Sequence, residues 1–226
     1  MIKLNKLRKI AYISFQNSLR LHNDAIALYR DGRYPSSFYL SILAQEEIGK
    51  MHIINDYLWN ADINGIPADF EEEWLGLVYK HPYKQHSFLK NSPLTNWSPK
   101  GLEAMEKVFK GSTEVNKQGS VYVGLLRNKG KIDAKGKVKH PFQITKALAK
   151  KQITEINDYL LVVSIGVRFT QYSLGNEEIE NEIRNKKFIK DIFRNSIDIS
   201  PSAIKMIKRF QKFFKEEIII LKKVRL

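Results

Sequence analysis

Apolar residues recur every three or four positions along much of this chain, and this spacing constrains the fold more than any other feature. The first such stretch spans residues 3–30, and its stripe consists of Leu4, Leu7, Ala11, Ser14, Phe15, Ser18, Leu21, Ala25 and Leu28. The spacing matches the 3.6-residue turn of an amphipathic α-helix. Asp31-Gly32 should end that helix, because glycine tolerates the left-handed conformation that follows a helix end.

The same spacing predicts about seven helices and an all-α bundle. Further helices are expected over residues 36–59, from 69 onward, and over 100–110, 144–174, 177–194 and 201–224. Pro82 should interrupt the third helix and push His81 towards an extended conformation. Residues 128–140 alternate lysine and glycine without a helical period, which predicts an exposed basic loop or short hairpin. We expect a helical bundle over 1–175 and a helical extension packed on it over 176–226.

The amino-acid composition of the chain excludes several kinds of site and several classes of protein. The 226 residues are 43% hydrophobic, enough for a substantial core, and they include no cysteine. The lack of cysteine excludes disulfides, thiolate nucleophiles and zinc fingers, and it fits a cytoplasmic protein. The longest near-apolar run covers residues 159–167, well short of the ~20 residues of a membrane-spanning helix. No metal-ligand motif and no glycine-rich phosphate loop occurs, so neither a metal nor a cofactor is expected.

Positive charge is concentrated in two segments. The chain has a net charge of +14, of which residues 127–151 contribute +8 and residues 200–226 contribute +6. A localised basic excess suggests a polyanionic partner such as nucleic acid, although lysines can also serve solubility alone. The candidate contacts in the first segment are Arg127, Lys135, Lys137 and Lys139.

The helix expected over 36–59 carries charged residues inside its apolar arc. Glu46, Glu47 and Lys50 fall near the centre of that arc, and Glu46 and Lys50 have the favourable i, i+4 spacing for an ion pair. The opposite, polar side holds Ser41, Gln45, His52 and Asn55, and His52 is expected to be exposed. Because an unpaired buried charge costs several kcal/mol, the three charged residues form either a buried network that fixes helix register or an inward-facing polar site.

Residues 24–50 resemble the opening of the AbiV-type abortive infection proteins. The shared pattern is an Asp-Ala helix, a Gly-Arg-Tyr turn at residues 32–34, and a helix that ends in Glu-Glu-Ile-Gly-Lys at residues 46–50. Two later landmarks also match: His81-Pro-Tyr-Lys84, and a segment from Lys117 to Tyr122-Val123. The resemblance covers roughly residues 10–175, and the Glu-Glu-Ile-Gly-Lys element is its most specific part.

The resemblance implies a HEPN-like helical bundle. HEPN proteins are often dimers, and many are metal-independent ribonucleases of toxins and phage-defence systems. The implied partners are RNA or the translation machinery, a second copy of the chain, and a phage protein as trigger. On this resemblance Lys117 and Tyr122 join the nucleic-acid contacts. The usual HEPN pair, an Arg followed four to six residues later by His, is absent from this chain.

Metal-independent RNA cleavage needs a base for the 2′-hydroxyl proton, an acid for the leaving oxygen and a cation for the phosphorane charge. His81 or His86 could serve as base or acid, because histidine titrates near neutral pH. Lys84 or Lys50 could supply the cation, and Glu46 or Glu47 could orient a histidine. The alternative is that both histidines are exposed loop residues beside a proline.

These observations favour a phage-defence protein that acts on RNA or the translation apparatus, with metal-independent cleavage as the candidate reaction. A second hypothesis is a non-catalytic helical module that binds and blocks a protein or RNA partner. A third is a membrane-surface toxin that acts through the basic amphipathic helix expected over 201–224.

Overall fold

Ten α-helices make up most of the described part of the chain, which comprises residues 2–64, 68–95, 99–125, 127–128, 131–132, 134–170 and 172–213 of a computed structural model. The helices are α1 (Leu4–Arg30), α2 (Tyr34–Asn64), α3 (Ala68–Leu77), α4 (His81–Asn91), α5 (Pro99–Phe109), α6 (Ser112–Gly119), α7 (Lys146–Phe169), α8 (Glu177–Ile183), α9 (Lys186–Asn195) and α10 (Pro201–Phe213). The expected all-α bundle is therefore confirmed.

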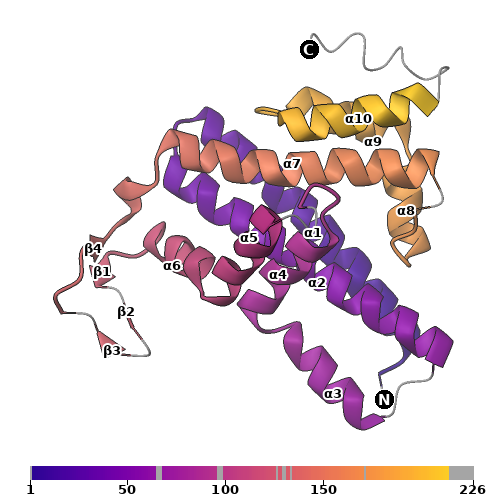
Figure 1. Ribbon diagram of the computed structural model, residues 1–226, viewed down its shortest axis with the longest axis horizontal. Coiled ribbons are helices and arrows are strands. Elements are labelled where there is room, and N and C mark those ends of the chain that lie inside the picture. Colours follow the sequence, from indigo (N-terminus) through magenta and orange to yellow (C-terminus); the bar gives the residue numbers. More distant parts are fainter. Residues whose placement is uncertain are drawn as a thin grey trace.

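Helices α1 and α2 form the centre of the bundle. They are joined by a tight turn in which Gly32 has a positive φ of 77°, and they pack against each other along much of their length (Figure 1). The long helix α7 crosses this pair, and α10 runs along α7 (Figure 1). None of the helices in the described ranges is long and apolar enough to cross a membrane.

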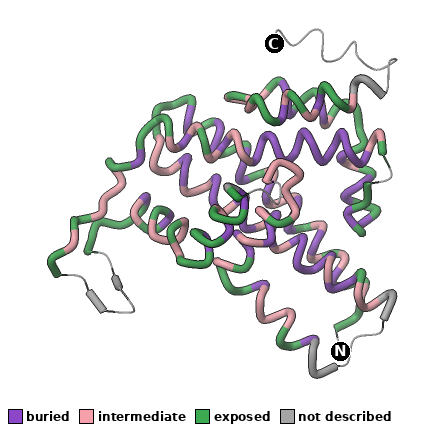
Figure 2. Tube along the Cα trace, in the orientation of Figure 1, coloured by how far each residue is buried: buried purple, intermediate pink, exposed green. Residues whose placement is uncertain are grey.

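Helix α2 is covered on nearly all sides. From Tyr34 to Leu58 no residue of α2 is exposed, because α1, α4 and α7 pack around it (Figure 2). The expectation of an exposed polar side with His52 on it was wrong. His52 is 3% exposed and its Nε2 lies 2.6 Å from the hydroxyl of Tyr159 on α7, and the side chain of Gln45 bonds to Gln152 on the same helix.

The described part of the structure has three helices more than the seven expected: α4, α6 and one that results from the division of the segment 177–194. Pro82 starts a helix instead of only ending one: Lys80 is extended, with φ −96° and ψ 113°, and α4 begins at His81, which is therefore helical and not extended. The segment 177–194 divides in two, because the side chain of Asn185 accepts a hydrogen bond from the Lys187 amide and caps α9. Helix α6, with little apolar content, was not predicted.

Some predicted helix ends also differ. Helix α2 continues to Asn64, and α7 is preceded by a 3-10 helix, η1 (Pro141–Gln143), and starts only at Lys146, where Thr145 caps it. The predicted last helix is confirmed over α10, whereas its continuation over residues 214–224 lies outside the described residues.

Residues 121–140, here called the arm, leave the bundle after α6 and return to it before η1. The arm contains strands β1 (Gly124–Leu125), β2 (Arg127–Asn128), β3 (Lys131–Ile132) and β4 (Val138–Lys139). β1 pairs antiparallel with β4, with Gly124 opposite Lys139, and β2 pairs antiparallel with β3 (Figure 1). The described residues of the basic segment thus form two short antiparallel strand pairs that project from the helices (Figure 1).

The C-terminal helices share the core of the bundle. Ile179 of α8, Ile192 of α9 and Ile207 of α10 are buried in the same apolar cluster as Phe15 of α1 and Leu160 of α7. The division of the chain at residue 175 stays a prediction.

Two core histidines make stability depend on pH. Burial lowers the pKa of His22 to about 4, with a partly opposing hydrogen bond to Asn157, and burial together with Lys90 lowers the pKa of His52 to about 3. Both stay neutral in the folded protein while their unfolded forms take up protons below about pH 6.5. Above pH 6.5 the two histidines therefore do not lower the free energy of unfolding. As the pH falls from 6.5 towards their pKa values in the folded protein, proton uptake by the unfolded chain lowers that free energy.

We expect the free energy of unfolding to fall between pH 6 and 4.5 by about 1.4 kcal/mol per pH unit for each of these histidines. Urea unfolding at several pH values measures this slope. His52→Gln cannot take up the proton, so its slope should be smaller than that of the wild type by the share of one histidine. Equal slopes for the two proteins would contradict the lowered pKa of His52 in the folded protein.

Candidate functional site

The carboxylate of Glu46 is the centre of a polar cluster buried between α2, α4 and α6. Glu46 is 2% exposed. Its Oε1 accepts hydrogen bonds from Gln85 Nε2 at 2.8 Å and from Lys117 Nζ at 2.9 Å. Its Oε2 accepts one from His81 Nδ1 at 2.7 Å, and Lys84 Nζ lies 3.6 Å from the same oxygen. Residues from three helices therefore converge on one side chain.

These donors decide the charge of Glu46. Burial alone would raise the pKa of this carboxyl, but the hydrogen bonds from Lys117, Gln85 and His81 and the charge of Lys117 outweigh burial and lower it. Glu46 is thus ionised at neutral pH, and its buried charge is compensated by neighbours and not by water.

Gly49 allows α4 to come close enough for these bonds. A Cβ atom at residue 49 would lie 1.8 Å from the carbonyl oxygen of Lys84 and 2.6 Å from its carbonyl carbon, so only glycine fits between α2 and α4. The first turns of α4 thereby bring His81, Lys84 and Gln85 against Glu46. This close contact explains why the Glu-Glu-Ile-Gly-Lys element has a glycine at residue 49.

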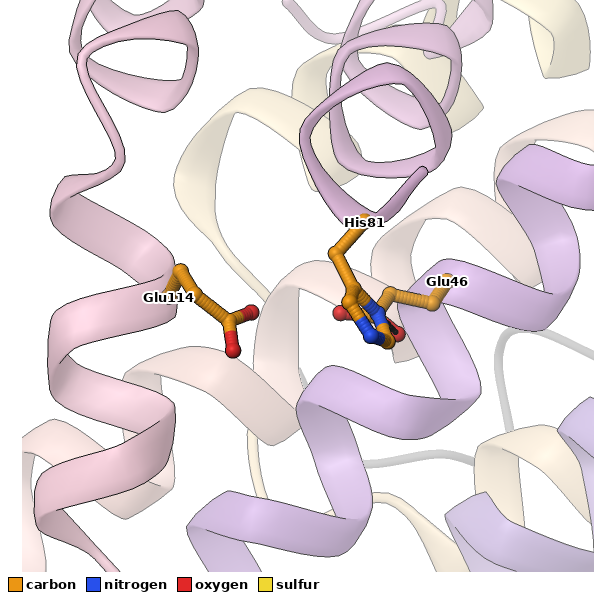
Figure 3. A group of neighbouring side chains, drawn as sticks. All are labelled: Glu46, His81 and Glu114. Atoms are coloured by element: carbon orange, nitrogen blue, oxygen red, sulfur yellow. Dashed lines mark hydrogen bonds and ion pairs between the residues drawn. The ribbon is translucent and has the colours of Figure 1, made fainter. Parts of the chain in front are cut away.

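His81 is the exposed member of the cluster. Its side chain is 47% exposed, whereas that of Glu46 is 3% exposed. Figure 3 shows its ring against the carboxylate of Glu46. Two groups contact Nδ1 of His81: the Glu46 carboxylate at 2.7 Å and the ammonium of Lys117 at 3.2 Å. An ionised carboxylate only accepts hydrogen bonds, so the shorter contact is a hydrogen bond when Nδ1 carries the proton. Nε2 is then unprotonated in the neutral ring and is the nitrogen available to take a proton from a substrate.

Lys117 and Glu114 on α6 complete the cluster. Lys117 is 5% exposed and its ammonium also pairs with Glu114 at 2.8 Å. Burial would lower the pKa of Lys117, but hydrogen bonds to Glu114 and Glu46 raise it. Lys117 was expected among nucleic-acid contacts, and the structure places it inside this cluster. Glu114 and Gln85 were missed; the i, i+3 spacing of Glu114 and Lys117 was the available signal.

Glu47 and Lys50 lie beside the cluster but do not join it. Their side chains are partly exposed, and Lys50 Nζ lies 3.7 Å from Glu47 Oε2. The ion pair expected between Glu46 and Lys50 does not form; Lys117 and Lys84 are the cations next to Glu46. Lys50 instead lines a groove between α1, α2 and α3.

His86 faces a different part of the surface. Its ring is 4.4 Å from that of Phe109 on α5, and burial, with a contribution from Lys90, lowers its pKa. No contact joins it to Glu46 or His81 among the described residues. His81 and His86 are both helical, so the alternative that they are loop residues is wrong.

The remaining predicted contacts lie on the arm. Tyr122 is 68% exposed, Lys135 and Lys137 are exposed, and Lys139 is half-buried. Arg127 belongs to β2, but its side chain is outside the described part of the structure. The structure adds exposed apolar side chains next to these residues, among them Val123 and Phe142.

A comparison with family models matches residues 6–161 to the family HEPN_AbiV, described as AbiV. This match covers more than half of the chain and includes the whole Glu46 cluster. The comparisons with curated proteins and with solved structures each gave no match.

Gly49→Ala tests the close contact of α2 and α4. The added methyl group must push the helices apart and break the bonds to Glu46, so we expect a loss of about 3 kcal/mol or more in the free energy of unfolding, the upper range for overpacked sites. Gly76→Ala on α3 is the matched control, since nothing lies within 4 Å of its Cβ position. That control should be neutral or slightly stabilising. Urea denaturation that gave equal stabilities for both variants would contradict this role of Gly49.

Proposed function

The chain belongs to the HEPN_AbiV family, and we propose on that premise that it acts on RNA as a metal-independent endoribonuclease. Family membership indicates an abortive-infection protein, a class that protects bacteria from phage. The proposal adds the RNA target, a cytoplasmic location and a homodimer as the working form. RNA within the translation apparatus and activation by a phage protein belong to the same proposal.

One observation carries the catalytic part of the proposal: a half-exposed histidine is hydrogen bonded, through Nδ1, to a fully buried carboxylate. This is the arrangement of an oriented general base, because the carboxylate fixes the orientation of the ring. Gln85 and Lys117 in turn hold Glu46, so the orientation of His81 does not depend on water.

In the proposed reaction, Nε2 of His81 takes the proton of a ribose 2′-hydroxyl. The 2′-oxygen attacks the adjacent phosphorus, the bond to the 5′-oxygen breaks, and His81 returns the proton to that oxygen. Lys84 lies close to the Oε2 of Glu46 that holds His81 and is the candidate cation for the phosphorane charge. Lys117 holds Glu46 at 2.9 Å and also lies 3.2 Å from Nδ1 of His81, so it acts as a positioning residue.

The arm supports binding without catalysis as a second candidate function. The arm exposes lysines and the aromatic ring of Tyr122, and the ring of Phe142, which is 88% exposed, follows the arm in η1. Cations and stacking rings are the usual contacts of single-stranded nucleic acid. A protein that binds through the arm and blocks a partner would need no reaction at His81.

We expect purified protein in EDTA to cleave total cellular RNA and to leave 2′,3′-cyclic phosphate ends, which end mapping detects. His81→Ala should abolish cleavage and phage protection and still give a folded protein by circular dichroism, because the ring is half exposed. His81→Ala with full phage protection would exclude catalysis by His81 and would favour the blocking function.

Neutralising the arm tests the binding surface. Lys135, Lys137 and Lys139 changed together to Ala should leave stability within about 0.5 kcal/mol and should weaken RNA binding. The slope of log affinity against log salt should become less negative by up to about 2, at roughly 0.7 per lost phosphate contact on single strands.

The matched control removes three exposed lysines far from the arm: Lys9, Lys187 and Lys190. It changes the net charge by the same amount. Equal RNA affinity of the arm variant and this control would remove the arm from the binding surface.

A further inference from the structure

The ammonium group of Lys117 lies between three atoms that are suitable metal ligands. Its Nζ is 2.9 Å from Glu46 Oε1, 2.8 Å from Glu114 Oε2 and 3.2 Å from His81 Nδ1. Glu46, Glu114 and His81 each offer one ligand atom, and these atoms lie within 4.8 Å of one another (Figure 3). In the described part of the chain this is the group with the geometry for a bound metal ion.

We propose that Lys117 is the resident cation of a Glu46–His81–Glu114 metal-type site. Its ammonium group takes the place of a divalent ion and keeps such ions out of the wild-type protein. Removal of this side chain should convert the cluster into a site for a transition-metal ion. The inference concerns the occupant of the cluster alone and does not depend on the proposed action on RNA.

The donor set is one that first-row metals accept. Two carboxylates and an imidazole suit Zn²⁺, Co²⁺ or Mn²⁺, and solvent can complete the coordination. Two of the ligands come from residues that the fold already holds, because Glu46 is fixed by Gln85 and His81 is fixed by Glu46. Coordination through Nδ1 requires only that neutral His81 carry its proton on Nε2.

Distances explain why a lysine and a metal would exclude each other here. Metal–ligand bonds of about 2.0–2.2 Å are shorter than the 2.8 to 3.2 Å that separate Nζ from the three ligand atoms, so these atoms must move inward to bind a metal ion. The side chain of Glu114 is 23% exposed, which leaves it room to move inward. The space at the centre is filled by Nζ, so a metal can enter only when Lys117 is shortened.

The experiment compares metal binding by untagged wild-type protein and Lys117→Ala. Isothermal titration with Zn²⁺ should give binding to the variant at least about tenfold tighter than to the wild type, the size of effect that a single supporting group has on metal affinity. Co²⁺ should produce visible absorption bands in the variant only. The double variant Lys117→Ala/Glu114→Gln should lose the added affinity, because one carboxylate ligand is gone.

Lys84→Ala is the matched control for removing a lysine beside Glu46. Lys84 lies 3.6 Å from Oε2 and not among the three ligand atoms, so its variant should bind Zn²⁺ no better than the wild type. Zn²⁺ should also raise the melting temperature of Lys117→Ala and leave that of the wild type unchanged. If Lys117→Ala unfolds in EDTA, refolding in Zn²⁺ should recover it.

Two outcomes would overturn the inference. The first is wild-type binding as tight as that of Lys117→Ala, which would mean that the ammonium group blocks nothing. The second is a Lys117→Ala protein that neither binds Zn²⁺ when folded nor refolds in its presence.

Discussion

The buried negative charge of Glu46 is the constraint on which this structure depends. An ionised carboxylate inside a helical bundle costs several kcal/mol unless hydrogen-bond donors surround it. In this structure the donors come from α4 and α6, two short helices. The cluster adds polar contacts to the apolar docking of α4 through Phe88, and Gly49 makes the close approach of α4 sterically possible.

The two oxygens of this carboxylate face different surroundings. Oε1 receives Gln85 and Lys117, both buried, whereas Oε2 receives the half-exposed His81. From the sequence alone, the charged residues of α2 had two competing interpretations, a network that fixes helix register and an inward-facing polar site. A buried polar network is observed at Oε1, where Gln85 and Lys117 tie α4 and α6 to α2, whereas an active site at the half-exposed His81 stays a proposal.

Much of the fold could be predicted from residue spacing, because the long helices α1, α2 and α7 have the apolar period of amphipathic helices. The family could also be predicted, because its motif is local in the sequence. The partners of Glu46 could not. Lys50 has the right spacing on α2, but the cations that reach Glu46 come from residues 84 and 117, far along the chain. Spacing within one helix carries no information about such contacts.

The polar side of α2 is a second feature that could not be interpreted from residue spacing within the helix. Ser41, Gln45 and His52 have the composition of a solvated face, yet all three are buried. Helix α7 pairs Gln152 with Gln45 and Tyr159 with His52, whereas Ser41 donates to the Ser37 carbonyl within α2. Helix α6 escaped prediction for the opposite reason, since it has no apolar stripe. An ion pair, and not apolar burial, holds it in place.

Helix α6 has a consequence for the motion of the arm. Lys117 is the one buried residue of α6, and the arm follows this helix directly. The root of the arm is therefore anchored by electrostatic bonds on one side and by the buried side chains of Ile144 and Ala149 on the other. Segments without buried apolar contacts open locally at low free energy. Helix α6 and the arm should accordingly form one cooperative opening unit, in which backbone amides exchange with solvent earlier than those of α1, α2 and α7.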